Sequence, residues 1–157
     1  MALELSTAGL SIGYCVEGTA GTRPTSGYTA IPEVKSIPAF GSDVNSLQTT
    51  PLSATHNHTY IAGLSDTGGA LALTVNDCPT FRTAWTGLIS AYTTGKASNK
   101  ATWFEIKYPT GAGTMQSIFF TGEPCELGFG GAEVDSVLEN TANIMPSSDL
   151  TWATAST

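Results

Sequence analysis

The sequence predicts a mainly β fold, an antiparallel β-sandwich or barrel with one packed α-helix at about residues 78–94 and with long loops. Three observations predict this class. Several segments alternate apolar and polar residues with a period of two, and a single segment repeats its large apolar residues at helical spacing. Polar stretches rich in Gly and Thr separate these segments. One helix among many antiparallel strands is typical of a sandwich or barrel against which the helix packs.

The first half of the chain predicts an alternating strand followed by less regular extended segments. Residues 10–17 alternate apolar and polar side chains, as in a half-buried strand. Residues 28–40 look extended, but Pro32 and Pro38 cannot donate to a strand ladder, so this segment belongs at an edge or contains a bulge. Residues 43–66 are polar and rich in turn formers, which predicts a long excursion with short strand pieces.

Residues 76–95 predict the helix. Asn76 and Asp77 offer N-cap oxygens, Pro79 suits a first helical turn, and Gly95 marks the end. An apolar face follows from five side chains, which we expect to pack on a sheet: Phe81, Trp85, Leu88, Ile89 and Tyr92.

The second half predicts strands at 69–75, 103–108, 115–121 and 133–144. The middle pair would form a hairpin that turns at Gly111 to Gly113. Residues 147–157 form a polar tail that we expect to be mobile unless a partner orders it. The predicted organisation is therefore a domain at 1–146 followed by a tail at 147–157.

The composition limits the possible functions. Charged residues make up 12% of the chain and the formal net charge is -7, with six scattered basic residues, which argues against binding to nucleic acid. The sequence shows no secretory signal and no apolar run long enough to span a bilayer, so we expect no membrane partner. Three widely spaced cysteines favour buried free thiols over disulfides or a zinc site.

The serine-hydrolase signature G-x-S-x-G occurs at residues 9–13, around Ser11, and Asp43 and His56 follow in a permitted order. This motif requires a sharp strand-to-helix turn, whereas Ser11 falls inside an alternating strand with no helix after it. A strand serine is the favoured interpretation, and we expect no enzymatic activity.

Other candidate sites are weaker still. His56 and His58 would point to the same side of an extended segment, as two metal ligands can, but no third ligand is evident nearby. Asn57 begins a glycosylation sequon without a secretory signal. Glu133, Asp135 and Glu139 would share one face of the last strand, which is more typical of a solvated wall than of a glycosidase site. We expect no metal and no cofactor.

The long polar segment between the first two extended regions, EGTAGTRPTSGY, is residues 17–28. Long loops without secondary structure are uncommon in a compact domain, and they usually act or bind. The low charge of the chain suits many close contacts with other protein surfaces.

Several phrases of the sequence resemble one family, the major tail or tail tube proteins of long non-contractile-tailed bacteriophages (siphophage type). The phrases are LSTAGLSIGY, GTAGTRPTSGYTAIPEVKSIP, TTPLSATHNHTYIAGLSDTGGALALTVND, FRTAW, ATWFEI, FFTGEP and EVDSVLENTANIMP. The resemblance extends over about residues 1–146 and contains no catalytic signature. It implies a tail-tube fold, a β-sandwich or barrel with one helix, in which six subunits form a ring and rings stack into a hollow tube that conducts the genome.

The resemblance also implies partners and a location. The partners are further copies of the chain, the tape measure protein in the lumen, and the terminator and distal tail or tip proteins, with DNA passing through without specific binding. The protein would be made in the host cytoplasm and reside in the virion tail. Loop residues would contact the neighbouring subunit or ring, among them Gly18, Thr19, Arg23, Pro24, Thr25, Tyr28, His56, His58 and Tyr60.

Four acids are candidates for the lumen wall, where carboxylates would repel the phosphates of DNA: Glu105, Glu133, Asp135 and Glu139. Neighbouring subunits would be the main contacts that order the 17–28 loop, which would serve as an assembly element. The alternative is a monomeric carbohydrate- or partner-binding β-sandwich module of a tail tip, for which Trp103, Tyr108 and Trp152 are the candidate aromatics.

Overall fold

The computed structural model describes residues 7–41, 43–108 and 116–156. Within these residues an eight-stranded antiparallel sheet forms the body, in the order β2-β1-β7-β8-β9-β6-β3, and β10 pairs with β8. Strands β4 and β5 form a separate two-stranded sheet. The elements are β1 (Ser11–Val16), β2 (Thr29–Ala30), β3 (Val34–Ser36), β4 (Asp43–Gln48), β5 (Tyr60–Asp66), β6 (Leu71–Asn76), α1 (Pro79–Ala97), β7 (Thr102–Lys107), β8 (Gln116–Pro124), β9 (Glu139–Pro146) and β10 (Thr151–Thr154).

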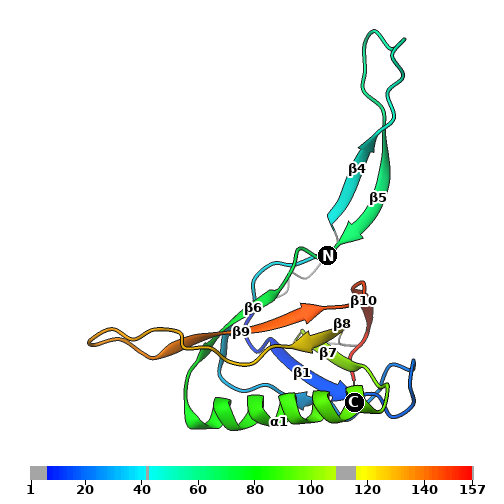
Figure 1. Ribbon diagram of the computed structural model, residues 1–157. Helices are drawn as coiled ribbons and strands as arrows, with labels where there is room; N and C mark the ends of the chain where they lie inside the picture. The colour runs from blue at the N-terminus through cyan, green and yellow to red at the C-terminus, as the bar shows by residue number, and fades with distance from the viewer. Residues whose placement is uncertain (1–6, 42, 109–115, 157) are drawn as a thin grey trace, which may run out of the picture.

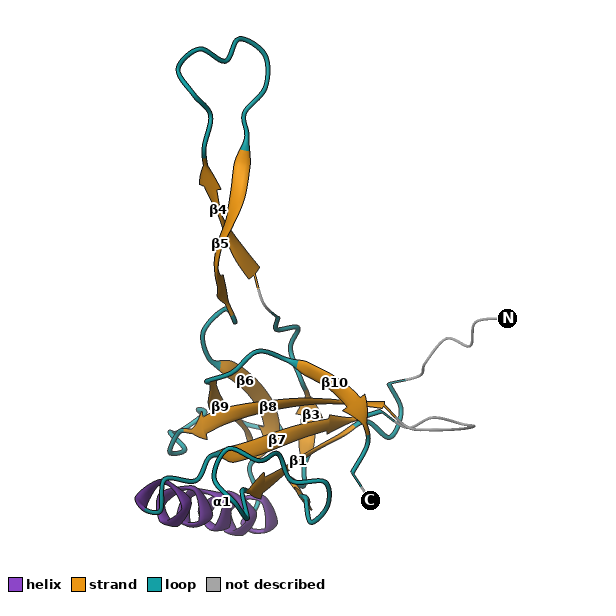
Figure 2. Ribbon diagram, turned by 90° about the vertical axis from the view of Figure 1, so that its right-hand side faces the viewer, coloured by secondary structure: helices purple, strands orange, loops and turns teal. Residues whose placement is uncertain are grey.

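The body sheet curls into a half-barrel, and α1 lies along one side of it (Figures 1 and 2). Strand β8 makes the curl possible because it changes partners along its length. Its residues 116–119 pair with β10, and its residues 122–124 pair with β9. The predicted class, a mainly β fold with one packed helix, is confirmed.

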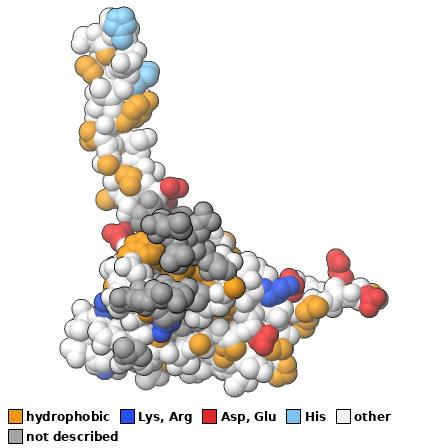
Figure 3. All heavy atoms as spheres, turned by 180° about the vertical axis from the view of Figure 1, so that it is seen from behind, with side chains coloured by type: hydrophobic (Ala, Val, Ile, Leu, Met, Phe, Trp, Pro, Cys, Tyr) orange, Lys and Arg blue, Asp and Glu red, His pale blue; other side chains and the backbone are white. Residues whose placement is uncertain are grey.

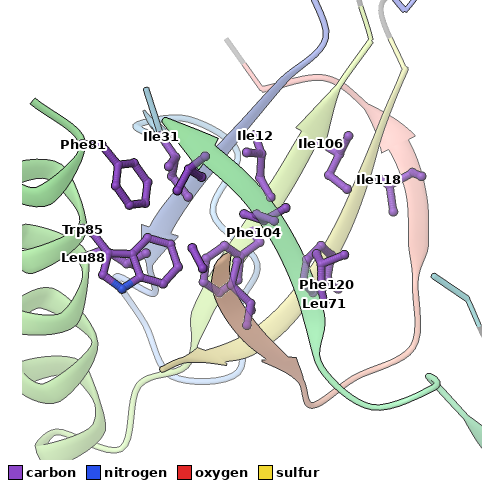
Figure 4. Packing of buried hydrophobic residues seen from close by; sticks show 14 residues of the cluster. Ile12, Ile31, Leu71, Phe81, Trp85, Leu88, Phe104, Ile106, Ile118 and Phe120 are labelled. Carbon is purple, nitrogen blue, oxygen red and sulfur yellow. The ribbon is translucent and has the colours of Figure 1, made fainter. Parts of the chain in front are cut away.

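The core lies between α1 and the concave face of the sheet (Figure 4). Phe81, Trp85 and Leu88 of the helix are each no more than 2% exposed. Ile89 packs against the edge of this cluster and is half-buried, as is Tyr92. The sheet contributes apolar residues from five of its strands, including Ile12, Leu73, Val75, Phe104, Phe120 and Ile144. Burying such large side chains is the main stabilising term of the fold.

The ends of α1 differ from the prediction. The N-cap is Cys78, in extended conformation and without a side-chain cap, and Asp77 instead accepts hydrogen bonds from the Arg82 side chain. The predicted N-cap at Asn76 or Asp77 is therefore wrong. The helix also continues past Gly95, which is buried, to Ala97. It ends where the Ser98 N–H bonds the Gly95 carbonyl and Asn99 turns to a φ of 56°.

The proline-containing segment 28–40 forms two very short strands at opposite edges of the sheet, β2 and β3. The register of β3 against β6 shifts between Val34 and Ser36, as at a β-bulge. An edge position or a bulge was expected from Pro32 and Pro38, and both are observed.

Two predictions about the C-terminal third are wrong. The last predicted strand, 133–144, starts only at Glu139, because residues 134–136 form a turn in which Asp135 has a φ of 65°. The tail expected to be mobile forms β10, which pairs antiparallel with β8 from Thr151 to Thr154. The predicted hairpin turn at Gly111 to Gly113 falls outside the described residues.

The three cysteines are free and half-buried, so they form no disulfide framework, as expected, although they are less enclosed than predicted. Among the described residues, no helix has the length and apolarity needed to cross a membrane.

Candidate assembly surfaces

Strands β4 and β5 form an arm, residues 43–66, that projects far from the body (Figures 1 and 2). The pairing runs from Asp43 opposite Asp66 to Gln48 opposite Tyr60, with an irregularity between Val44 and Ser46. Beyond Gln48 the hairpin stays closed because Thr49 N–H bonds the Thr59 carbonyl at 2.8 Å. The excursion predicted for this segment is thus a single long hairpin rather than a set of short strand pieces.

The arm exposes a series of large apolar side chains. Half or more of the surface of each is exposed, and the set comprises Val44, Leu47, Leu52, Tyr60, Ile61 and Leu64. No residue of the arm belongs to the core cluster. An isolated two-stranded hairpin is marginal in water, and a contiguous exposed apolar surface marks an interaction site. The arm is therefore the principal candidate surface for binding another protein.

The arm joins the body through two short connections. Gly68 and Gly69 have φ values of 83° and 87°, which only glycine adopts without strain. Ser65 Oγ donates to Asp149 Oδ1 of the C-terminal segment at 3.2 Å. Phe40 packs edge-on against Phe120 with ring centroids 5.2 Å apart. A cleft of about 350 Å³ lies between the two connections, lined by residues 38–41, Asp43, Thr67, Gly68, Ala70 and Leu71.

The two histidines lie near the free end of the arm (Figure 3). Nδ1 of His58 is 2.9 Å from Gln48 Nε2 and 3.3 Å from Thr50 Oγ1, so it is already engaged. In residues 7–41, 43–108 and 116–156 no three metal-ligating side chains gather. Asp43 lies at the base of the arm and Ser11 opposite Lys107 in the body, so the structure does not assemble Ser11, Asp43 and His56 into a triad.

The 17–28 loop is fastened to the body by its first residue. Glu17 is 5% exposed, and its carboxylate accepts hydrogen bonds from Trp103 Nε1 at 2.8 Å, Gly21 N–H at 2.9 Å and Ala101 N–H at 3.1 Å. Burial alone would raise the pKa of Glu17, but these bonds and the charge of Lys100 outweigh it and lower the pKa.

The far side of the same loop packs on the convex face of the sheet. The Arg23 guanidinium lies 4.1 Å from the centre of the Phe119 ring, and Tyr28 meets that ring edge-on at 5.8 Å. Tyr28 Oη donates to the Pro24 carbonyl at 3.2 Å. Burial is the main cause that raises the pKa of Tyr28, and the charges of Cys15 and Glu105 raise it further. The loop is thus ordered by its own chain, contrary to the expectation, and it leaves Gly18, Thr19 and Thr25 exposed.

The four candidate lumen acids do not share a surface. Glu105 is 3% exposed, and it lies beneath the C-terminal segment, where it accepts bonds from Ser156 N–H at 2.8 Å and Ser156 Oγ at 2.5 Å. Glu139 opens β9 and pairs with Lys35. Glu133 and Asp135 lie in the turn before β9. The strand face predicted from their spacing is wrong, because the turn at Asp135 interrupts the alternation.

Residues 128–138, between β8 and β9, form a second projection, which we call the finger (Figure 1). Both of its ends are held by the polypeptide just before α1 and by the start of β9. Asp77 N–H bonds the Leu138 carbonyl at 2.9 Å, and Asn140 Nδ2 bonds the Gly128 carbonyl at 2.8 Å. Asn140 also donates to Asp77 Oδ2 at 3.2 Å.

The finger was not predicted from the sequence as a projecting element. The glycine-rich stretch at its start was the sequence signal for a close backbone approach. The structure shows that approach at Gly130, where an added Cβ would lie 2.2 Å from the Glu139 carbonyl oxygen. It exposes Phe129, Val134 and Val137, which are 78%, 99% and 69% exposed. In the space-filling view its acidic side chains gather at the far end of the projection (Figure 3).

Neither a family model nor a curated protein matches the chain. Among the solved structures that share its fold are two from the same kind of particle. One is a chain of the anti-feeding prophage (AFP) baseplate, determined by cryo-EM with sixfold symmetry applied. It has a TM-score of 0.70 and 12% identity, with 98% of this chain and 97% of that chain covered. The other is from the anti-feeding prophage cap, described as a tube-terminating cap. It has a TM-score of 0.63 and 13% identity, with coverage of 99% and 94%.

The three aromatics of the alternative interpretation do not form an open platform. Tyr108 and Trp152 stack on each other with centroids 5.8 Å apart and planes 16° apart. Trp103 is half-buried and donates to Glu17. Only Trp152, at 60% exposure, presents much ring surface. This pair alone gives little support to a carbohydrate site.

Proposed function

We propose that the chain is a structural subunit of a phage tail or of a related tail-like particle, in which six copies form a ring and rings stack into a tube. The arm carries this proposal. It presents apolar side chains that its own chain leaves uncovered, on an element that contributes nothing to the core. The role is structural, without enzymatic activity or a cofactor.

The direction of the arm supports its use between rings. It projects from the body as a single element and extends well beyond it (Figure 2). In a stack of rings such an element would reach the copy above or below and bury its apolar side chains there. Burial at about 25 cal/mol per Å² of apolar surface would then stabilise the stack. The partner of the arm is another copy of this chain.

The solved structures support a tail-like assembly. One neighbour belongs to a baseplate treated with sixfold symmetry, and the other to a cap that terminates a tube. Both alignments cover nearly the whole of each chain. The resemblance of the sequence to siphophage tail tube proteins supports the tube specifically, with the terminator, the distal tail or tip proteins and the tape measure protein as partners. The location is the virion tail.

We further propose that the tube has an acidic lumen. Six copies would carry about six times -7, or -42 formal charges, and DNA passing within the Debye length of roughly 8 Å would be repelled rather than bound. This part of the proposal rests on the charge balance. Of the four acids expected at the wall, Glu105 is buried and Glu139 is paired in the isolated chain.

The exposed parts of the 17–28 loop and of the arm tip would make the contacts between subunits. Gly18, Thr19 and Thr25 are exposed on the loop, and His56, His58 and Tyr60 are exposed on the arm. Because Arg23, Pro24 and Tyr28 hold the loop in place, the loop is ready to dock without ordering first.

Negative-stain electron microscopy of the concentrated protein tests this proposal. We expect hollow filaments of uniform diameter built from stacked sixfold rings. The double variant Ile61→Ser/Leu64→Ser should leave folded subunits or single rings that do not stack. Met145→Thr is the matched control, because it also removes an exposed apolar side chain but lies on the body. This control should form normal tubes.

Two results would contradict the proposal. If the arm variant forms normal tubes, the arm does not make the stacking contact. A wild-type protein that stays monomeric, even when a tail-tip complex is added as a nucleus, would contradict the tube subunit itself. Glycan binding by the monomer would then favour the tail-tip module.

A further inference from the structure

The finger is an acidic, partly apolar projection without a charge partner. In the described residues neither Glu133 nor Asp135 takes part in an ion pair, and residues 128–138 contain no Lys or Arg. Phe129, Val134 and Val137 are largely exposed beside these acids. Both ends of the finger are hydrogen-bonded, at Asp77 and Asn140, which attaches its base to the body.

The opposite end of the molecule carries three cations. Arg23, Lys96 and Lys100 lie there, around the end of α1 and the 17–28 loop. Three acids accompany them, and one of these, Glu105 opposite Phe119 in the sheet, is buried and accepts bonds from Ser156. Glu17 has its oxygens occupied by Trp103, Gly21 and Ala101, and Glu123 pairs with Lys96 at 3.2 Å. No carboxylate in the described part of the chain lies within ion-pair distance of Arg23 or Lys100.

The helix separates the two ends. The base of the finger lies over the first turns of α1, where Leu127, Gly128 and Phe129 share a cleft with Asp77, Arg82 and Thr86. The 17–28 loop meets the chain just past the last turn, where Glu17 bonds Ala101 N–H. At 1.5 Å per residue the 19 residues of α1 span roughly 28 Å. Neither end coincides with the arm, which leaves the body in another direction (Figure 1).

We propose that the finger of one copy docks against the 17–28 loop and the Lys96–Lys100 end of the next copy in the same ring. Glu133 and Asp135 face the cations Arg23 and Lys100, and the apolar finger residues are covered by the contact. Two complementary patches on opposite ends of one molecule make a head-to-tail contact, which generates a ring when the rotation closes. This inference rests on the proposed ring. It assigns the contact between neighbouring copies within a ring to charge complementarity, whereas the arm makes the contact between stacked rings.

Charge reversal at both ends tests the contact. Finger variant Glu133→Lys/Asp135→Lys should repel the basic end, and end variant Arg23→Glu/Lys100→Glu should repel the acidic finger. Each alone should raise the protein concentration needed for ring formation by about tenfold or more, because like charges brought together are strongly unfavourable. Mixed in equal amounts, the two variants should again form rings with alternating copies, since every contact then pairs opposite charges.

The control is Glu33→Lys/Glu126→Lys, which makes the same change in net charge outside the finger and should assemble like the wild type. Circular dichroism establishes that each variant is folded. Ring formation is measured by sedimentation velocity and negative-stain microscopy at low salt, and it should weaken as salt rises.

The outcomes separate this contact from the tube proposal. If the finger variant forms rings as readily as the wild type, or if mixing restores nothing, the finger contact is wrong and the tube subunit is untouched. If the wild type forms no ring, the tube proposal fails. The finger contact is then tested by mixing the two charge-reversed variants. A 1:1 pair of the two variants in sedimentation supports the contact, and two unassociated species overturn it.

Discussion

Gly95 of the helix meets Val16 of β1 so closely that a Cβ added to Gly95 would lie 2.7 Å from Val16 Cγ1. Gly95 is one of the four buried residues of α1. The contact sets how near the last turns of the helix approach the sheet. It also explains why a residue that usually ends helices stands inside this one.

Gly95→Ala should therefore destabilise the protein, although alanine is the better helix former. Val16 is β-branched and stiff, so it cannot move aside easily. We expect a loss of about 1–3 kcal/mol in the free energy of unfolding, measured by urea denaturation. Gly87→Ala is the matched control, because the nearest atom to its added Cβ is Tyr14 Oη at 3.9 Å. This control should gain about 0.5–1 kcal/mol; equal effects of the two changes would contradict the close contact.

Trp85→Ala should be among the most damaging substitutions. Trp85 is 2% exposed, stacks with Phe81 at 5.6 Å, and donates from Nε1 to the Cys125 carbonyl at 2.9 Å. We expect a loss of about 3–5 kcal/mol in thermal or urea unfolding of the isolated subunit. A loss below about 1 kcal/mol would be incompatible with this packing. Trp85→Phe keeps the ring without the hydrogen bond and should cost less.

Glu17→Gln should loosen the 17–28 loop in a pH-dependent way. The pKa of Glu17 is lowered in the folded protein, so its stabilising effect is present above its ordinary value of 4.5 and is lost as the pH falls through the lowered value. At pH 7 the substitution should cost about 1–3 kcal/mol, since charged hydrogen bonds are lost. In acid the variant and the wild type should unfold alike. A difference that persists unchanged at low pH would show that charge is not the cause.

Removing the arm should leave the body folded. No residue of the arm belongs to the core, and its contacts with the body include a single-atom link, the hydrogen bond from Ser65 Oγ to Asp149 Oδ1. Replacing residues 44–65 with a short glycine-containing turn should change the free energy of unfolding by no more than about 1 kcal/mol while abolishing tubes. Loss of cooperative unfolding in calorimetry would show that the arm does stabilise the body.

Asn140→Ala should release the finger without unfolding the core. Asn140 is 6% exposed, and it donates to both Gly128 and Asp77. Leaving these acceptors unpaired should cost about 1–3 kcal/mol. Hydrogen exchange should speed up first in residues 128–138, whereas Asn143→Ala on the same strand should leave exchange there unchanged. Uniformly faster exchange over the whole sheet would contradict a local clamp.

Periodicity was sufficient to predict β1, β6, β7, β8 and the helix of the body, because their apolar faces pack within the same chain, but it missed β10 and the start of β9. It could not predict the arm as a projection. Leu47 and Leu64 have the same character whether their own core or another copy covers them, so the sequence does not reveal which surface they meet. The sequence predicted a long polar excursion. The antiparallel pairing of its two strands depends on contacts across the hairpin, which no local sequence pattern indicates.

The mistaken site predictions share a physical cause, which is contact between residues distant in sequence. Alternation correctly placed Glu105 on the face of β7 opposite to Phe104, but Ser156 of the C-terminal segment covers that carboxylate. Asp77 is a residue type that suits an N-cap, yet Arg82 and Asn140 engage its oxygens instead. Neither partner could be identified from spacing along the chain.

The pairing of β6 with β9 has a mechanical consequence. A short connection at residues 67–70 joins the arm to β6, and β6 is paired with β9 at six successive positions, from Leu71 opposite Ile144 to Asn76 opposite Glu139. Tension on the arm along β6 would load these backbone pairs together, in shear, rather than opening them one after another. The subunit is thus suited to carry force from the arm into an extensively paired part of its sheet.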